Sequence, residues 1–363
     1  MKHQPEYQIK VLQSLADIAP YAGRWNQLCA GLPHQNPLMS HTWLSTYFEY
    51  CTDDFLHWSV ICAFQGDELV GILPVILVNS RRYGLNFQEI SLPYNSETMS
   101  VDMVIAPQHG QALYDVLYKA AFRQYPKARY LHLRRIDGLS NSLQQIPGKL
   151  HVQEFIENGA GMANDSDFAS RKSALPKNFK SNLNKARNKL EREGPCTFVM
   201  DNTADPLQQM QIVIDTERLS WKGQAGSAIA CSEKNVRFYH ALAQRLAAQG
   251  WLRVHYLQVN NQIIAANMGI LFAGNLLLWK LGYDEQHRKL SPGGILIEEL
   301  LKNVDGDKNV SRVDLMTNED WYTNWNMQWR PFYDLYIYTW HPLSLYLAAM
   351  QKLKIRIKKL LKR

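Results

Sequence analysis

The feature that most constrains the fold is a β-hairpin pattern that occurs twice. Residues 58–78 ("WSVICAFQGDELVGILPVILV") and residues 252–271 ("LRVHYLQVNNQIIAANMGIL") each predict a strand, a two-residue turn and a second strand. The turns fall at 66–67 in the first pattern and at 260–261 in the second. The second hairpin continues through "FAGN" into a third predicted strand, 276–283.

The elements around the two hairpins also repeat. Helical patterns precede them at 20–30, 38–51, 206–221 and 233–249, and a helix and then a strand follow at 109–124, 129–134, 293–303 and 311–316. The same order in both halves predicts a duplicated domain. We therefore expect an α/β (α+β) fold with two tandem domains, each a mixed, mostly antiparallel central sheet flanked by helices. The expected boundaries are 1–165 and 166–340, followed by a basic amphipathic helix at 341–363.

Composition restricts the class of protein. The chain has 363 residues, of which 46% are apolar and 20% are charged, as is typical of a globular protein. Its five cysteines are scattered and include no C-x-x-C, which argues against a zinc site and for a reducing compartment. The start of the sequence shows no signal-peptide core, and no uninterrupted apolar run is long enough to span a membrane. We therefore expect a cytoplasmic protein without a metal.

The net charge of +7 is concentrated at the C-terminus. The last 13 residues, "QKLKIRIKKLLKR", contain seven Lys or Arg and no acid, and the remaining chain has 33 basic and 33 acidic residues. A DNA-binding protein usually carries its basic residues on a folded face, so this distribution argues against DNA as a partner. The segment 343–363 also carries an apolar helical stripe, which consists of Tyr346, Met350, Leu353, Ile357, Leu360 and Leu361. Two interpretations fit it: a peripheral helix on the inner face of an anionic membrane, or a charged helix packed on the domain.

A basic helix is predicted between the two halves. In "ASRKSALPKNFKSNLNKARNKLEREG" the apolar residues recur every three or four positions and form one stripe: Leu175, Phe179, Leu183, Ala186 and Leu190. The other faces carry eight Lys or Arg, including Lys180 and Arg187. These cations form either a solvated helix face or a cradle for an anionic acceptor.

The stretch "KLGYDEQHRKLSPGGILIEEL" (280–300) joins a predicted strand to a glycine-rich helix start. The first N–H groups of a helix lack intrahelical partners and lie at its positive end, so they favour an anion. Ser291 is the expected N-cap, Pro292 suits the first helical position, and Gly293 and Gly294 allow close approach by a phosphate. Arg288 and Lys289 add charge on the approach. The alternative is a capped helix that merely follows a strand.

The segment "RKLSPG" resembles the R/Q-x-x-G-x-G/A loop of the GNAT acyltransferase superfamily, in which this loop binds the pyrophosphate of coenzyme A. Arg288 occupies the first position, Ser291 replaces the first glycine, and Gly293 is the last. Four further segments follow one another as in the cellulose-biosynthesis (CelD-type) acetyltransferases, which are relatives of the tandem-GNAT FemAB aminoacyl transferases: "KNFKSNLNKARNKLEREG", "SWKGQAGSAI", "YLQVNNQIIAANMGI" and "VDLMTNEDWYTNW". The resemblance covers roughly residues 171–338. The first half resembles the family's N-terminal GNAT-like half only in layout.

The resemblance implies two GNAT-like domains and an acyl-CoA donor, most simply acetyl-CoA, bound by the C-terminal one. The family often shows an Asp followed eight residues later by Tyr-Lys, and here Asp314 and Tyr322 keep that spacing while Thr323 replaces the Lys. In the aminoacyl-transferring relatives this lysine stabilises the reaction centre, so Thr323 argues against a tRNA-dependent reaction. The polar loop "LPYNSETMSVD" (92–102) offers no glycine-rich anion site, and we do not expect the first half to bind coenzyme A.

In a GNAT-type reaction the acceptor amine attacks the thioester directly, so the enzyme positions both substrates and removes a proton. A strand-end N–H between Leu281 and Tyr283 is the expected donor to the thioester carbonyl. Asp284 is the first choice of general base, and Asp320 or Glu319 is the second. Each has a structural alternative, since Asp284 is also suited to fixing the turn.

Three further residues complete the expected site. Tyr322 is the expected acid that protonates the leaving thiolate, or else it packs against Trp325. Trp221 and Lys222 are expected to line the acceptor pocket, and core packing is the alternative for the tryptophan.

Three functions follow from these features. The first is an acyl-CoA-dependent N-acyltransferase acting on an amino sugar or a related small-molecule or glycan precursor of surface polysaccharide, where the acceptor class comes from the resemblance. The second is a FemAB-like aminoacyltransferase that uses charged tRNA and a cell-wall precursor. The third is a non-catalytic accessory protein of polysaccharide export, which would bind no donor.

Overall fold

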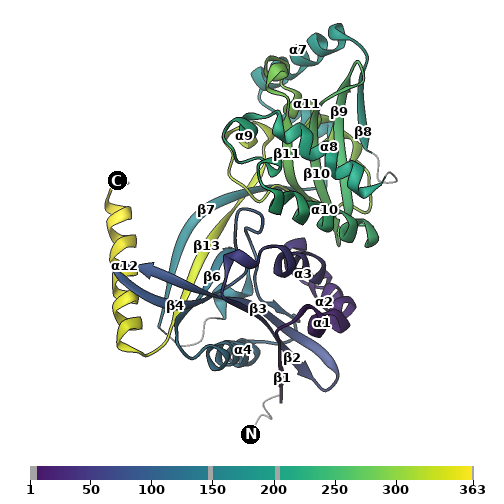
Figure 1. Cartoon of the computed structure of the whole chain (residues 1–363). Helices are drawn as coiled ribbons and strands as arrows, with labels where there is room; N and C mark the ends of the chain where they lie inside the picture. The colour runs from purple at the N-terminus through teal and green to yellow at the C-terminus, as the bar shows by residue number, and fades with distance from the viewer. Residues whose placement is uncertain (1–5, 146–149, 201–204, 362–363) are drawn as a thin grey trace. The chain divides into compact units, whose positions relative to one another are not determined.

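The structure, a computed structural model, describes residues 6–145, 150–200 and 205–361. The chain divides into two compact units, each of which is described here on its own. Unit 1 consists of Met1–Asn158 and Arg330–Arg363, and unit 2 consists of Gly159–Trp329. The chain passes between them twice, within strand β7 (His151–Ala163) and within strand β13 (Gln328–Tyr338) (Figure 1).

Unit 1 is built on a mixed sheet with the strand order β1-β2-β3-β4-β6-β13-β7, and β5 pairs with β3. β4 and β6 are parallel, and the pairs β1–β2, β2–β3, β3–β4 and β6–β13 are antiparallel. Its other strands are β1(Gln8–Leu12), β2(His57–Gln65), β3(Glu68–Arg82), β4(Leu85–Ser91), β5(Val104–Ile105) and β6(Ala128–Asp137). Its helices are α1(Leu15–Ile18), η1(Ala19–Tyr21), α2(Ala22–Ala30), η2(Pro37–Met39), α3(His41–Tyr50), η3(Thr52–Asp54), α4(Gln111–Gln124), α5(Asn141–Gln144) and α12(Pro342–Leu361).

The strands of unit 2 form mixed β-sheet in the order β12-β11-β10-β9-β8, and the end of β7 pairs with β12. β11 and β12 are parallel, and the other pairs are antiparallel. Its strands are β8(Cys196–Met200), β9(Leu252–Val259), β10(Gln262–Phe272), β11(Asn275–Tyr283) and β12(Arg312–Asp314). Its helices are α6(Phe168–Ala174), α7(Lys177–Glu193), α8(Pro206–Arg218), α9(Trp221–Gln224), η4(Ile229–Cys231), α10(Glu233–Ala248), η5(Glu285–Leu290), α11(Pro292–Asn303) and η6(Asp320–Trp325).

Both predicted hairpins are present, as β2–β3 and β9–β10. Asn260 and Asn261, which join β9 to β10, have φ of 50° and 64°. Two successive positive φ angles match the right-handed twist of a two-residue hairpin, and asparagine tolerates them better than most residues. The local sequence therefore specifies this turn and fixes the register of the two strands that it joins.

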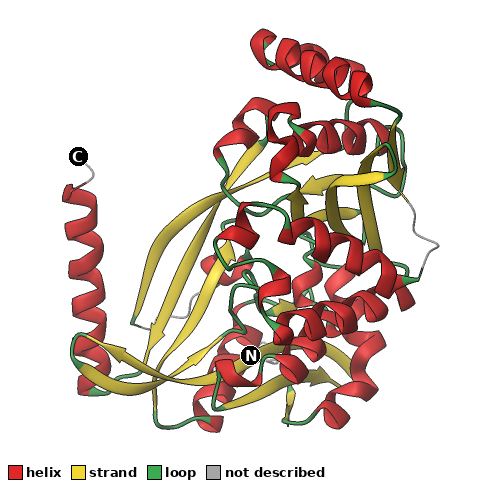
Figure 2. Ribbon diagram, turned by 45° about the horizontal axis from the view of Figure 1, so that its top comes forward, coloured by secondary structure: helices red, strands yellow, loops and turns green. Residues whose placement is uncertain are grey.

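The predicted duplication is confirmed by the order of elements. Unit 1 runs α2, α3, β2, β3, β4, α4, β6, and unit 2 runs α8, α10, β9, β10, β11, α11, β12. In unit 1, α4 and then β6 come after β4, and β6 pairs parallel to β4. In unit 2, α11 and then β12 come after β11, and β12 pairs parallel to β11. Figure 2 shows helices beside the strands in each unit, as expected for an α+β fold.

The division into units differs from the predicted domains. Residues 330–340 were expected in the C-terminal domain and 341–363 as a separate helix, but both belong to unit 1. The physical reason is strand pairing: β13 is antiparallel to β6, with Tyr336 opposite His132 and Tyr338 opposite Tyr130. One face of α12 packs on this sheet, because its residues Leu347 and Ala348 share a hydrophobic cluster with both tyrosines of β13.

The predicted basic helix is confirmed as α7. Leu183, Ala186 and Leu190 of its apolar stripe are buried. Leu183 packs in a cluster with Ile297 and Leu300 of α11, and Leu190 in a second cluster with Ile295 of the same helix. The stripe of α7 therefore covers α11, the helix that begins at the glycine-rich turn.

Candidate active site

The β11–β12 pair opens at the end of β11. β12 pairs with only the first three residues of β11, and the last matched pair is Leu277 with Asp314. β10, on the other side, stays paired with β11 as far as Tyr283. Within the part of the chain that the structure describes, residues 278–283 therefore have no β12 residue opposite them. This opening leaves the predicted strand-end N–H region, Leu281 to Tyr283, without a ladder partner on one side, as hydrogen bonding to a thioester carbonyl requires.

The glycine-rich turn follows directly after this strand end. The chain passes through η5 and enters α11 at Pro292, which occupies the first helical turn as predicted. Ser291 lies at the N-cap position of α11, as predicted, but its side chain makes no cap bond. Its backbone is left-handed, with φ and ψ both 49°, whereas side-chain capping needs an extended N-cap.

The left-handed backbone at Ser291 explains why the related loops carry glycine at this position. Glycine adopts this region freely, whereas a residue with a Cβ pays about 1–2 kcal/mol. The serine therefore keeps the loop conformation at some cost.

The two glycines after Pro292 differ in what surrounds them. A Cβ added at Gly293 would lie 3.4 Å from the Tyr283 ring and 3.6 Å from Leu281, which are ordinary contacts. A Cβ at Gly294 would lie 2.9 Å from Ser291 Oγ. The fold thus leaves room for a side chain at Gly293, and close ligand approach accounts for the glycine there better than packing does. Arg288 is exposed, and its Nη1 lies 3.9 Å from a carboxylate oxygen of Glu285.

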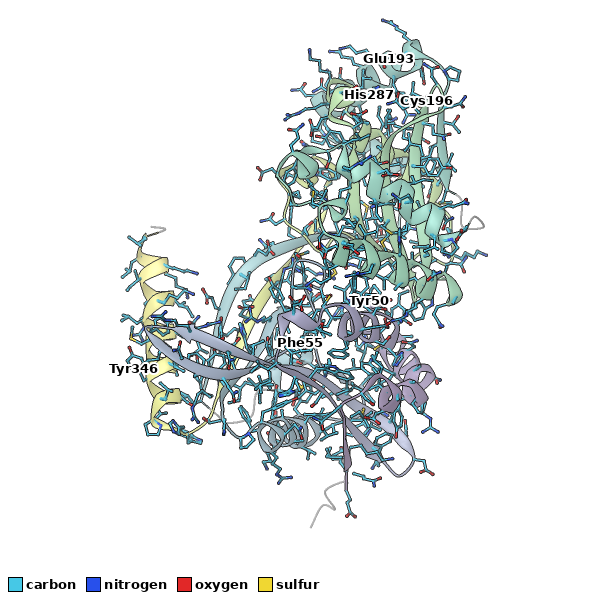
Figure 3. All side chains as sticks on the ribbon, in the orientation of Figure 1. Tyr50, Phe55, Glu193, Cys196, His287 and Tyr346 are labelled. Atoms are coloured by element: carbon cyan, nitrogen blue, oxygen red, sulfur yellow. The ribbon has the colours of Figure 1, made fainter. Side chains whose placement is uncertain are left out.

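Asp284 joins β11 to η5 and is buried. Its Oδ1 accepts a hydrogen bond from the Gln286 N–H at 2.9 Å, and its Oδ2 lies 3.3 Å from His287 Nδ1. Figure 3 labels His287 at the same end of unit 2 as Glu193. These contacts give Asp284 the turn-fixing role that was the alternative to a general base. The base assignment remains a prediction, and His287 is the neighbour that would accept a proton from it.

Tyr322 lies in η6, which follows β12 after a short connection. Its hydroxyl is 3.1 Å from Thr317 Oγ1, and its ring packs edge-on against Trp321. It belongs to the same hydrophobic cluster as Trp325 and Leu278, and Leu281 packs against that cluster. Burial raises the pKa of Tyr322 to about 12, and the hydroxyl therefore holds its proton at neutral pH, as an acid must.

The remaining predicted catalytic residue lies apart from this cluster. Asp320 is exposed at the start of η6. Thr323, which stands where the relatives have lysine, is also exposed.

Lys222 is part of a buried ion pair beside β11. Its Nζ lies 2.7 Å from Glu217 Oε1 and donates to the Leu281 carbonyl at 3.2 Å. The other oxygen of Glu217, which is 1% exposed, accepts the Ile229 N–H at 2.9 Å. Gly282 allows this approach, because a Cβ there would lie 2.6 Å from Glu217 Cα. The pair fixes α8 and α9 against the end of β11.

Sequence reasoning missed Glu217, although a signal was present. Met210, Val213, Ile214 and Glu217 follow the spacing of one helix face, and the first three are apolar. A carboxylate in such a series predicts a buried acid with a cationic partner, which the structure provides five residues later. Trp221, by contrast, is an exposed residue of α9.

The basic residues of α7 are partly neutralised. Arg187 donates to Glu298 Oε2 and lies 2.6 Å from Glu299 Oε1, while Lys172 of α6 is 2.9 Å from the other oxygen of Glu298. Burial disfavours both charges, but the ion pairs prevail, because they raise the pKa of Arg187 and lower that of Glu298. Lys180 donates to the Ser173 carbonyl at 2.6 Å. Arg187 and Lys172 thus hold α7 and α6 on α11, and Lys180 joins α7 to α6. The acceptor-binding role of Lys180 and Arg187 stays a prediction.

A groove of about 500 Å3 lies next to α11, beside Arg187, Cys196, Phe198 and Ile295. Figure 3 labels Cys196 and Glu193 at the two ends of the turn from α7 to β8. The groove does not include the predicted turn residues. Within the described ranges, no group of three His, Cys, Asp or Glu side chains is placed to hold a metal ion.

Comparisons with known proteins agree with this geometry. Residues 177–324 match a family model described as acetyltransferase (GNAT) domain. That range contains α7, the opening of β11, the glycine-rich turn and Tyr322. No curated protein matches the chain in sequence.

Several solved structures share the fold over most of the chain. The crystal structure of FemX has a TM-score of 0.65 at 10% identity, over 90% of this chain and 98% of that one. A conserved protein of unknown function from Bacteroides thetaiotaomicron has a TM-score of 0.58 at 12% identity, over 92% and 100%. The C-terminal domain of a putative lysylphosphatidylglycerol synthetase from Agrobacterium fabrum has 0.54 at 12% identity, over 92% and 95%. At these identities the likeness concerns the fold alone.

Proposed function

We propose, from the premise that residues 177–324 form an acetyltransferase (GNAT) domain, that the chain transfers an acyl group from acyl-CoA to the amine of an amino sugar or a related precursor of surface polysaccharide. A GNAT-type acyltransferase is the class that the domain match supports. The finer parts of the proposal are acetyl-CoA as the donor and an amino sugar as the acceptor.

One observation carries the proposal: the open end of β11 leads directly into a glycine-containing helix start. The opening leaves Leu281 to Tyr283 unmatched by β12, and the turn places Gly293 at the N-terminus of a twelve-residue helix. Unpaired helix N–H groups and the helix dipole favour a diphosphate at that end. An acyl-CoA carries a diphosphate and a thioester in one molecule. It would place the diphosphate at the start of α11 and the thioester at the open end of β11.

The reaction follows from these positions. The acceptor nitrogen attacks the thioester carbon, the C–S bond breaks, and the thiolate leaves with the electron pair. A backbone N–H at the end of β11 stabilises the oxyanion that forms on the carbonyl oxygen. Tyr322, which keeps its proton at neutral pH because burial raises its pKa to about 12, gives that proton to the departing thiolate and regains one from solvent. The ammonium proton of the acceptor passes to Asp284 and on toward His287.

Lys222 is assigned to the same site as a positioning residue. Its ammonium is bonded to the Leu281 carbonyl, one residue before Gly282, and its charge is balanced by Glu217. This contact fixes the strand end from which the oxyanion is stabilised.

The proposal is tested by incubating the purified full chain with acetyl-CoA and a panel of amino sugars, both free and nucleotide-linked. Free thiol release and the mass of the product report transfer, and the same sugars with a blocked nitrogen are the matched controls. Product with the free amines but not with the blocked ones supports N-acylation. Transfer to a blocked sugar through a hydroxyl group would overturn the amine assignment and leave the donor assignment intact.

The alternative reaction uses an aminoacyl-tRNA and a cell-wall precursor. The shared fold with FemX is the observation that favours it. Transfer from charged tRNA, in the absence of transfer from acetyl-CoA, would establish this reaction in place of the proposed one. A folded chain that binds neither donor would favour an accessory protein of polysaccharide export.

A further inference from the structure

The C-terminal helix α12 is held on unit 1 by one of its faces. Ser344 Oγ donates to the Arg129 carbonyl at 2.8 Å, and Leu347 and Ala348 are buried among aromatic side chains. Gln351 accepts from Tyr83 and donates to the buried carboxylate of Glu154 at 2.6 Å. This face therefore has specific polar partners as well as apolar ones, and it fixes which way the helix is turned.

The opposite face of α12 is apolar and exposed. It carries exposed members of the stripe predicted from the sequence: Tyr346, Leu353 two turns later, and Ile357 and Leu360 at the turns that follow. Leu360 is 69% exposed, and Trp340, just before the helix, is 73% exposed. Figure 3 shows Tyr346 on the side of α12 that faces away from the strands of unit 1. The docked helix thus presents a continuous apolar stripe where solvent-facing polar residues would be expected.

Basic residues flank this stripe. At 100° per residue, Lys352, Arg356 and Lys359 lie along one side of it, and all three are exposed. Lys354 lies along the other side, with its Nζ 3.8 Å from Glu154 Oε2, and Lys358 is bonded to Glu154 at 2.7 Å on the docked face. The sequence has no Asp or Glu after Asp334. The exposed face of α12 is therefore apolar in the middle and positive at its edges.

We propose that this face of α12 binds the surface of an anionic lipid bilayer, with the helix axis in the plane of the membrane. The apolar side chains would enter the boundary between head groups and acyl chains, and the flanking cations would contact lipid phosphates. Trp340 and Tyr346 suit this boundary, since both have an apolar ring and a polar end. Among the described residues, no helix is long and apolar enough to cross a membrane.

Charge complementarity selects a lipid surface over other occupants. A second copy of the chain, packed stripe to stripe, would bring two rows of lysine and arginine together, which is unfavourable. A nucleic acid would use the cations but would leave the leucine and isoleucine side chains in contact with water. An anionic bilayer satisfies both parts of the face. The inference does not depend on the proposed acyl transfer.

The test is flotation of the full-length chain with vesicles made of equal parts phosphatidylglycerol and phosphatidylcholine, compared with vesicles of phosphatidylcholine alone. The charge variant replaces Lys352, Arg356 and Lys359 by glutamine. Its matched control replaces Lys119, Arg123 and Lys127, which are exposed at and just after α4 of the same unit, in the same way. The apolar variant replaces the exposed residues 353, 357 and 360 by glutamine.

The proposal predicts binding to the anionic vesicles only, with release as ionic strength rises. The charge variant should bind about a hundredfold more weakly, at roughly fivefold per basic residue, while the matched control keeps wild-type binding. The apolar variant should also lose binding with an unchanged melting temperature, because its three positions are already exposed. The proposal would be overturned if the control variant lost as much vesicle binding as the charge variant. Association with RNA or between copies of the chain in place of vesicles would also overturn it.

Discussion

Replacing Gly282 by alanine should push the end of β11 away from helix α8. A Cβ at this position would lie 2.6 Å from Glu217 Cα and 2.9 Å from Glu217 N, both backbone atoms of α8. Carbon atoms in good contact are about 3.5–4.0 Å apart, so α8 and β11 would have to separate by roughly 1 Å. Overpacking of this kind costs about 1–3 kcal/mol, and the shift would also stretch the bond from Lys222 to the Leu281 carbonyl.

The assay is thermal unfolding of the full chain followed by calorimetry. For a unit of this size, about 1–3 kcal/mol corresponds to a fall of roughly 2–12 °C in the transition of unit 2. Gly293→Ala is the matched control, because its Cβ would meet nothing closer than 3.4 Å. The control should melt at or slightly above the wild-type temperature, since alanine favours a helix. A Gly282→Ala protein that melts with the wild type would refute the reasoning about close approach.

Three further predictions concern single sites in unit 2. Ser291→Gly should raise the free energy of unfolding in urea by up to about 1 kcal/mol, because glycine adopts the left-handed backbone of Ser291 without strain. A loss of stability would show that the serine side chain contributes to the fold. Lys222→Met should destabilise by about 3 kcal/mol by leaving the Glu217 carboxylate unpaired, and adding Glu217→Gln should recover most of that loss; an equally unstable double variant would contradict the ion pair. Burial lowers the pKa of His255 to about 4, so the unfolded chain binds the extra proton. Stability should therefore be full above about pH 6.5 and fall by at most about 3 kcal/mol toward pH 4, with a shallower pH slope in His255→Gln.

The hairpins could be predicted because their information is local. The apolar strands beside Asn260 and Asn261 need only each other and a turn that accepts positive φ. The helix after the glycine-rich turn is local in the same sense, since Pro292 and the apolar spacing mark its start. Order and type of the elements therefore followed from neighbouring residues.

The division into units could not be predicted, because it depends on pairing between distant segments. Tyr336 finds its partner His132 about two hundred positions earlier, and nothing near either residue specifies that register. Glu89 pairs with Arg134 and lies 3.8 Å from His132 Nδ1, and His132 Nε2 lies 3.0 Å from Asp334 Oδ2 of β13, which adds a long-range polar requirement to the same pairing. Such contacts become visible only once the strands are placed side by side.

The candidate site was predicted only in part, because some of its residues lie in local motifs and others depend on contacts between distant segments. The turn residues 288–294 and Tyr322 were identified from motif spacing. The structure puts the turn at the start of α11 and Tyr322 in the cluster that Leu278 and Leu281 of β11 join, and their roles stay predictions. The conformation of Ser291 was missed, because a serine before proline is more often an extended cap. The ion pairs of Arg187 with α11 were missed because the carboxylates lie more than a hundred residues away in the sequence.

The most direct test of the central claim is calorimetric titration of the full chain with acetyl-CoA, alongside the double variant Arg288→Ala, Gly293→Asp. The matched control is Arg123→Ala, Gly110→Asp, which makes the same changes in unit 1, where a Cβ at Gly110 would meet nothing within 4 Å. The account predicts saturable binding by the wild type and the control, and binding weakened more than tenfold in the variant, because a cation is lost and a carboxylate is placed at the helix start. No binding by the folded wild type, or equal binding by the variant, would contradict the assignment of the diphosphate to this turn.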